Sequence, residues 1–134
     1  MNNEFWLEDA LKWAKMGTCK NRSYGCVLVY GNEYISRGFT QVLPGNQCYK
    51  NECVRLKNNI PHGRGYEECG SIHAEQMALI DSMNIPQGTV CYLACVDTKG
   101  NEIVDNIEPC YICKKLLQYA GIKTVITRNN IIRY

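Results

Sequence analysis

At 134 residues, with 46% hydrophobic and 21% charged residues, the chain has the composition of a globular domain and not of a disordered segment. Its 15 basic and 13 acidic residues give a net charge of +2 and are spread along the chain, which does not indicate a polynucleotide substrate. The sequence has no signal-peptide pattern and no stretch near the roughly 20 apolar residues that span a bilayer, so we expect a cytoplasmic protein with no membrane contact.

The first half of the chain predicts a helix, a hairpin and a long loop. Apolar residues recur at helical spacing over 3–16, which indicates a helix that faces the core. Residues 26–30 and 33–39 flank Gly31-Asn32, a pattern typical of two strands joined by a tight turn. Residues 40–71 show no sustained periodicity, and a loop of this length in a compact domain is usually functional or pinned.

The second half predicts alternating helices and strands. We expect a helix over 73–83, a strand over 89–96, a short return strand within 102–107, a helix over 109–119, a strand over 122–127 and a short strand from Ile131. This order predicts one domain over 1–134 with a three-layer α/β/α sandwich and a mixed sheet of about five strands. The later strands are expected to be parallel and linked by crossover helices.

Two short motifs carry metal-binding side chains. These are His73-Ala74-Glu75 at the start of one predicted helix and Pro109-Cys110-Tyr111-Ile112-Cys113 at the start of the next. Cys110 and Cys113 are three residues apart and share a helix face, and Pro109 suits the first helical position. His73 and the two cysteines supply three zinc ligands of mixed type, whereas a structural zinc site normally closes with a fourth Cys or His. The set therefore indicates a catalytic zinc site with an open position.

Glu75 lies two residues beyond His73 and can approach a water molecule in that open position without binding the metal. Our hypothesis is that Glu75 takes a proton from water, passes it to a ring nitrogen of the substrate and later helps protonate the departing amine. Two alternatives treat the motifs separately. Cys110 and Cys113 alone could form a thioredoxin-like redox pair, and His73 alone could be a core histidine. The combination with Glu75 favours the zinc site.

The pattern H-x-E followed by P-C-x-x-C is the signature of zinc deaminases. The chain resembles the cytidine and deoxycytidylate deaminase superfamily over nearly its whole length, and it is most similar to the deoxycytidylate deaminase branch, which includes competence-operon proteins. Further segments that carry the resemblance are Gly25–Val29, Ala120–Ile126, Cys19, Cys48, Cys53, Leu56–Gly63 and Cys69–Gln76.

The resemblance implies dCMP as the substrate, dUMP and ammonia as the products, and a homo-oligomer between a dimer and a hexamer. Members of the branch commonly carry Asn where this chain has Thr40 and Met77. Deamination of another amino-heterocycle, such as a nucleoside, a free base or guanine, is therefore an alternative. A zinc-stabilised binding or regulatory module that has lost catalysis is a second alternative, although it would have no use for Glu75.

The remaining cysteines suggest a second, structural zinc. Candidate ligands for a closed site that pins the long loop are Cys19, Cys48, Cys53, Cys69 and His62. The alternative is that these cysteines are unpaired small hydrophobic residues.

Other side chains have simpler interpretations. We expect core positions for Cys26, Cys91 and Cys95, and core or interface positions for Trp6 and Trp13. The basic loop residues could bind a substrate phosphate or form a solvated face; they are Arg55, Lys57, His62 and Arg64.

Overall fold

The computed structural model describes residues 2–19, 21–44, 58–59 and 70–134. Its helices are α1 (Asn3–Lys15), α3 (Ala74–Asp81) and α4 (Tyr111–Tyr119). Its strands are β1 (Arg22–Tyr30), β2 (Glu33–Phe39), β3 (Gln41–Val42), β4 (Ser71–Ile72), β5 (Val90–Asp97), β6 (Glu102–Ile103), β7 (Thr124–Ile126) and β8 (Ile131–Arg133). None of these helices has the length and apolar character that would let it cross a membrane.

Six strands form one mixed sheet in the order β2-β1-β5-β7-β8, with β6 paired to β5. β1 is antiparallel to both β2 and β5, β5 is parallel to β7, and β7 is antiparallel to β8. The predicted mixed sheet is confirmed with six strands in place of about five. The expected parallel pairing of the later strands holds for β5 and β7, which α4 connects, but not for β8.

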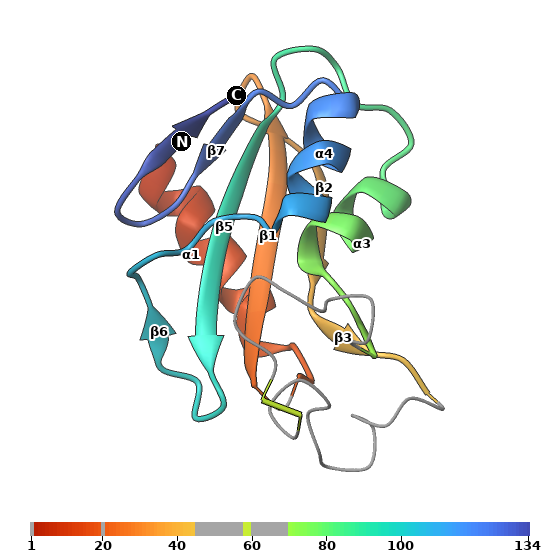
Figure 1. Ribbon diagram of the computed structural model, residues 1–134. Helices are drawn as coiled ribbons and strands as arrows, with labels where there is room; N and C mark the ends of the chain where they lie inside the picture. The colour runs from red at the N-terminus through yellow and green to blue at the C-terminus, as the bar shows by residue number, and fades with distance from the viewer. Residues whose placement is uncertain (1, 20, 45–57, 60–69) are drawn as a thin grey trace.

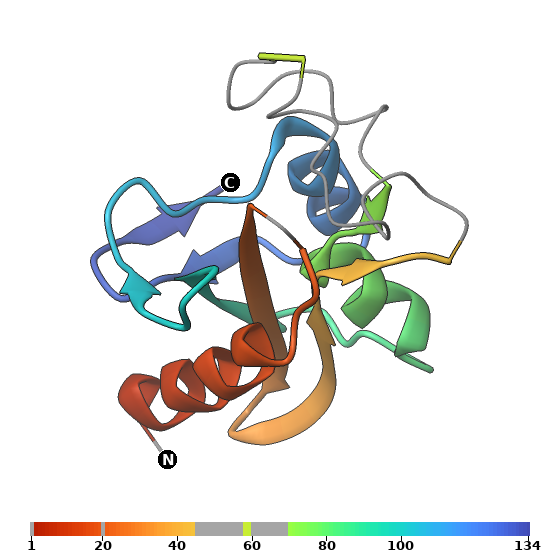
Figure 2. The same cartoon turned by 90° about the horizontal axis from the view of Figure 1, so that it is seen from below.

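The sheet is the middle layer of the predicted three-layer sandwich, which is confirmed. α1 covers one face, and α3 and α4 cover the other, as two perpendicular views show (Figures 1 and 2). Alternate residues of β1 and β5 face opposite layers. Val27 packs in the cluster of α1, while Leu28, Cys91 and Leu93 pack in the cluster of α3 and α4. Both faces of these central strands are therefore apolar, which explains their nearly continuous hydrophobic sequence.

The predicted hairpin between β1 and β2 turns at Gly31-Asn32. Both residues have positive φ, 54° at Gly31 and 66° at Asn32. A two-residue turn with positive φ at both positions matches the right-handed twist of the flanking strands. The turn prediction is confirmed, but β1 begins at Arg22, four residues before the expected start at Cys26.

The two helices that carry the motifs begin later than predicted, α3 by one residue and α4 by two. His73 and Cys110 have extended backbone and are the N-cap residues of α3 and α4. The prediction that Pro109 takes the first helical position is wrong. The Cys110 sulfur accepts a hydrogen bond from the Cys113 backbone N–H, so Cys110 caps the helix and Pro109 precedes it.

Two glycines allow helices to lie directly on the sheet. A Cβ at Gly38 would collide with the backbone of Ala74 and Ala78 in α3, and a Cβ at Gly25 would collide with the backbone of α1. Gly38 therefore sets how closely the start of α3, with His73 and Glu75 on either side of Ala74, approaches the sheet.

We predict that Gly38→Ala lowers the free energy of unfolding by about 1–3 kcal/mol, because the added methyl group overpacks the contact with α3. Urea denaturation measures this loss. Gly25→Ala is the matched control, since it overpacks the opposite face against α1. Both variants should lose stability, but only Gly38→Ala should also weaken zinc retention in a competition with a chelator. Equal zinc retention in the two variants would show that Gly38 does not position α3 for metal binding.

Several predictions concern residues outside the described part of the chain. They are the second-zinc candidates Cys48, Cys53, Cys69 and His62, and the phosphate candidates Arg55, Lys57 and Arg64. Within the segment 40–71, the described residues include β3 and β4, which pair as a small antiparallel sheet. The prediction of a second zinc site stays a prediction.

Candidate metal centre

The beginnings of α3 and α4 meet on one face of the sheet and bring three metal-binding side chains together. His73 Nδ1 lies 3.5 Å from Cys110 Sγ and 3.3 Å from Cys113 Sγ. The potential ligand atoms of these three residues all lie within 4.8 Å of one another. The structure therefore assembles the predicted set from segments almost forty residues apart in the sequence, and the set is positioned to hold a metal ion.

Local hydrogen bonds hold the backbone at His73, the first of the three candidate metal ligands. The His73 backbone N–H donates to Gln76 Oε1 at 2.9 Å, which is one half of a capping box. The Cys26 thiol donates to the Ala74 carbonyl at 3.3 Å, so β1 holds the residue between His73 and Glu75. Gln76 was missed in the sequence, although a Gln three residues after an N-cap is the signal that would have found it.

The two thiols are strongly coupled. A hydrogen bond with Cys113 lowers the pKa of Cys110 to about 4, and the same interaction raises the pKa of Cys113. Cys110 is at the N-terminus of α4, where the helix dipole favours negative charge. A cation bound between the sulfurs would ionise both of them, since a coordinating thiol is deprotonated.

Glu75 is buried beside this cluster, with 4% of its surface exposed. Burial raises the pKa of Glu75 to about 7, and a hydrogen bond with Cys113 opposes that shift. Lone buried carboxylates are costly, because desolvation disfavours their charged form. Such a group next to a potential metal site is typical of proton transfer and not of packing.

Comparison with known proteins agrees with this geometry. A family model described as the cytidine and deoxycytidylate deaminase zinc-binding region matches residues 1–129. The chain belongs to this family. Zinc is the metal of the matched region, and the imidazole nitrogen and two thiolates fit its usual ligands. The prediction of a zinc cofactor is thus confirmed.

Relatives of this deaminase-family chain include longer proteins. Deoxycytidylate deaminase of Schizosaccharomyces pombe is 30% identical over 125 residues, which cover 92% of this chain and 36% of that protein. ComE operon protein 2 of Bacillus subtilis is 27% identical over 124 residues, which cover 92% of this chain and 57% of that protein. The chain therefore spans less than two thirds of the length of both relatives.

Solved structures confirm the predicted fold. The dCMP deaminase from the cyanophage S-TIM5, in its apo form, aligns with a TM-score of 0.61 at 20% sequence identity. The alignment covers 94% of this chain and 81% of that chain.

Thr40 and Met77, the two positions where the resemblance implies Asn, are both buried. Thr40 Oγ1 accepts a hydrogen bond from the Tyr24 backbone N–H at 2.9 Å. The Thr40 hydroxyl is therefore engaged with the backbone of β1. Met77 is buried in α3.

The other cysteines of the described residues fall into two groups. Cys26, Cys91 and Cys95 are fully buried in the core beneath α3 and α4, which confirms their predicted positions. Trp6 is buried in the other core cluster, on the side of α1, and Trp13 packs against that cluster. Cys19 is half-buried, and its sulfur accepts a hydrogen bond from the Asn21 backbone at 3.4 Å.

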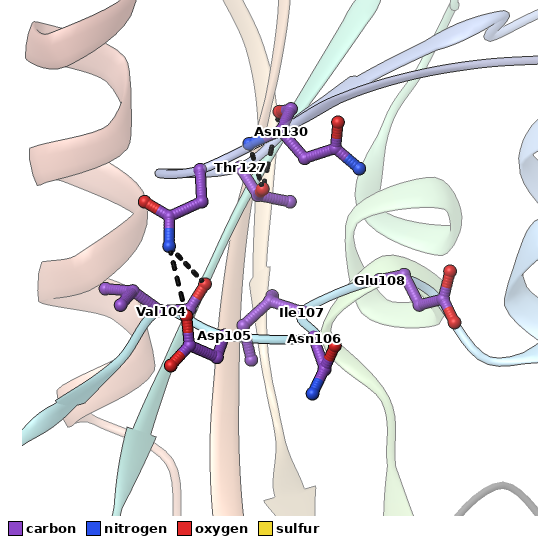
Figure 3. A pocket seen from close by; sticks show the side chains of 8 residues that line it. Val104, Asp105, Asn106, Ile107, Glu108, Thr127 and Asn130 are labelled. Atoms are coloured by element: carbon purple, nitrogen blue, oxygen red, sulfur yellow. Dashed lines mark hydrogen bonds between the residues drawn. The ribbon is translucent and has the colours of Figure 1, made fainter.

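A polar pocket lies beside the segment that leads to Cys110 (Figure 3). Its volume is about 430 Å³, and its lining includes Asp105, Glu108 and Thr127 but none of the four candidate site residues. On its wall, the Asn129 side-chain amide donates to the Val104 carbonyl at 3.2 Å and to Asp105 Oδ1 at 3.4 Å. The turn between β7 and β8 thereby holds the segment that precedes Cys110, a contact that the sequence did not predict.

Proposed function

We propose that this chain, folded as a single domain over residues 1–134, is a zinc-dependent hydrolase that deaminates dCMP to dUMP and ammonia. One observation carries the proposal: a His, two Cys and a buried Glu converge on one face of the sheet at the beginnings of two helices. A purely structural site has no use for the buried carboxylate of Glu75.

In this proposal, the three clustered side chains would hold the metal through His73 Nδ1, Cys110 Sγ and Cys113 Sγ. When bound, zinc supplies Lewis acidity that polarises water and lowers its pKa. The N-terminal ends of α3 and α4 keep the thiolates ionised, and Gln76 holds the backbone of His73 in place.

Glu75 is the proposed proton carrier. Its carboxylate accepts a proton from the attacking water, donates it to the ring nitrogen next to the carbon that bears the amine, and then helps protonate the departing amine. The reaction adds one water and releases one ammonia, so its atoms balance without a further reactant. The burial of Glu75 keeps bulk water from competing for the proton.

The choice of dCMP is supported by the names of the relatives, a deoxycytidylate deaminase among them. A specific observation favours a second candidate. Thr40 stands at a position where the resemblance implies Asn, and its hydroxyl is bound to the Tyr24 backbone. The side-chain amide that the resemblance implies is therefore missing, which favours another amino-heterocycle as the second candidate substrate.

Ammonia release from a panel of substrates tests the proposal. We expect the zinc-loaded protein to release ammonia faster from dCMP than from deoxycytidine, cytidine, cytosine, adenine or guanine. Faster release from another compound would replace dCMP with that substrate. Release from none of them by protein that retains its zinc would contradict the proposal and favour a binding or regulatory module.

We also propose a homo-oligomer, between a dimer and a hexamer, on a separate observation. α4 exposes large apolar side chains, with Tyr111 70% and Tyr119 95% exposed, and Ile112 and Leu116 lie between them. Exposed apolar groups clustered on one helix are typical of subunit contacts.

A further inference from the structure

The turn between β7 and β8 holds the segment that leads to the metal centre. This segment, residues 104–109, runs from β6 across the sheet to Cys110 at the start of α4 (Figure 1). The Asn129 side-chain amide donates to the Val104 carbonyl at 3.2 Å and to Asp105 Oδ1 at 3.4 Å (Figure 3). One side chain of the turn therefore holds the segment at two consecutive residues.

The turn itself is fixed in shape by its own hydrogen bonds. The Thr127 backbone N–H donates to the Asn130 carbonyl at 2.9 Å, and the Asn130 N–H donates to Thr127 Oγ1 at 3.1 Å. Thr127 is buried, and the Ile131 N–H donates to Asn130 Oδ1 at 2.9 Å. Asn129 is thus carried by a closed turn.

Arg128 fastens this turn to two other elements. Its guanidinium bonds both carboxylate oxygens of Glu102 in β6, at 3.0 and 3.2 Å, and one oxygen of Glu8 in α1 at 2.8 Å. A two-point contact between Arg and a carboxylate adds geometric specificity as well as energy. The side chains of Arg128 and Glu102 are 24% and 23% exposed, so water screens their contact only in part. The turn is therefore tied to α1 and to the strand that precedes the segment.

The position of Cys110 depends on this segment more than that of Cys113 does. Cys113 lies within the first turn of α4, where the helical backbone sets the direction of its side chain. Cys110 is the N-cap residue, with extended backbone at φ −65° and ψ 167°, so its sulfur follows the path by which the chain enters the helix. Between the Asn129 contact and Cys110, Ile107 and Pro109 are both buried. Close-packed side chains transmit a displacement of the segment to the start of the helix.

We propose that Asn129 is a positioning residue for the metal centre. Through the segment 104–109, it keeps Cys110 Sγ within reach of the zinc that His73 and Cys113 also hold. Asn129 does not touch the metal and acts through Cys110. This role goes beyond the proposed deamination, because it concerns how the centre is held and not the reaction.

Two measurements on the full chain test this role without turnover. They are the zinc retention of the loaded protein against a chelator, and the visible absorption of the protein after cobalt exchange, which reports on metal–thiolate contacts. Asn129→Asp places a carboxylate opposite the Val104 carbonyl and the Asp105 carboxylate, so it removes both contacts with little change in size. It should weaken zinc retention by about threefold to tenfold, the effect of one or two neutral hydrogen bonds, and reduce the thiolate-to-cobalt absorption per bound ion.

Asn3→Ala is the matched control. Asn3 Oδ1 accepts a hydrogen bond from the Tyr92 hydroxyl at 2.7 Å, and Tyr92 packs in the cluster of α1, on the other face of the sheet. The control therefore loses a comparable side-chain contact away from the segment. It should keep the wild-type zinc retention and cobalt absorption, and urea denaturation checks that both variants are folded.

A second substitution separates the lost contact from the added charge. Asp105→Asn in the Asn129→Asp background restores a donor between the two side chains and should recover part of the zinc retention. If it recovers none, the loss comes from the new charge and the positioning role is overturned.

Wild-type zinc retention and cobalt absorption in Asn129→Asp would also overturn the role, as would equal losses in Asn3→Ala. If Asn129→Asp does not fold, Asn129→Ala removes the donors without adding a charge and is measured against the same control. A protein that shows the expected losses but deaminates no substrate would refute the proposed function and still support the role of Asn129.

Discussion

Glu75→Gln should reduce ammonia release by roughly a hundredfold to ten-thousandfold, the usual contribution of a general acid–base group, while zinc stays bound. The amide is nearly the same size as the carboxylate and can fill the same buried space, but it cannot accept a proton from water or pass one to the substrate. Steady-state kinetics and a metal count on the same preparation measure the two effects together.

Glu108→Gln is the matched control for this experiment. Glu108 is exposed and lies two residues before Cys110, so the control makes the same chemical change near the site but outside the buried cluster. It should keep both zinc and turnover. A Glu75→Gln variant that turns over at the wild-type rate would refute the proton-transfer role of Glu75.

Cys113→Ala should lower the zinc content by about one ion per chain and abolish deamination, because two remaining ligands hold zinc poorly. Cys113 is fully buried in the first turn of α4, 3.3 Å from His73 Nδ1, so the substitution removes one of the three clustered ligand atoms. Elemental analysis after dialysis against a weak chelator measures the loss.

The matched control is Cys91→Ala, which removes another fully buried thiol from the same side of the sheet. Its loss of packing should cost about 1 kcal/mol of unfolding free energy and leave the zinc content unchanged. If Cys113→Ala retained the wild-type zinc content, Cys113 would not be a ligand of the metal.

Short-range patterns predicted the parts of the fold that local chemistry determines. Gly31-Asn32 predicted the hairpin because few residue pairs accept positive φ at two successive positions. The spacing of Cys110 and Cys113 predicted a shared helix face, and the structure places both sulfurs next to the His73 ring.

Pairing over long distances in the sequence was harder to predict. Arg22 and Tyr24 have no alternating apolar pattern of their own, and they join β1 because they pair with Asp97 and Cys95 of β5. The predicted strand therefore began four residues too late and omitted both of them. Likewise, the motif P-C-x-x-C does not show that Cys110 is the N-cap residue of α4 and that Pro109 lies before the helix.

The burial of Glu75 also depends on tertiary structure. Its position two residues after His73 suggested a carboxylate near the metal. Its burial depends on the packing of α3 over β2, which the absence of a side chain at Gly38 allows. Substrate choice could not be read from the motifs, because the motifs act at the reacting amine and not on the rest of the substrate.

The most direct test of the account is the fate of dCMP incubated with the zinc-loaded protein in water labelled with a heavy isotope of oxygen. Mass spectrometry should detect dUMP that carries one labelled oxygen, with one ammonia released for each dUMP formed. Recovery of unchanged dCMP from a protein with a full complement of zinc would contradict the account.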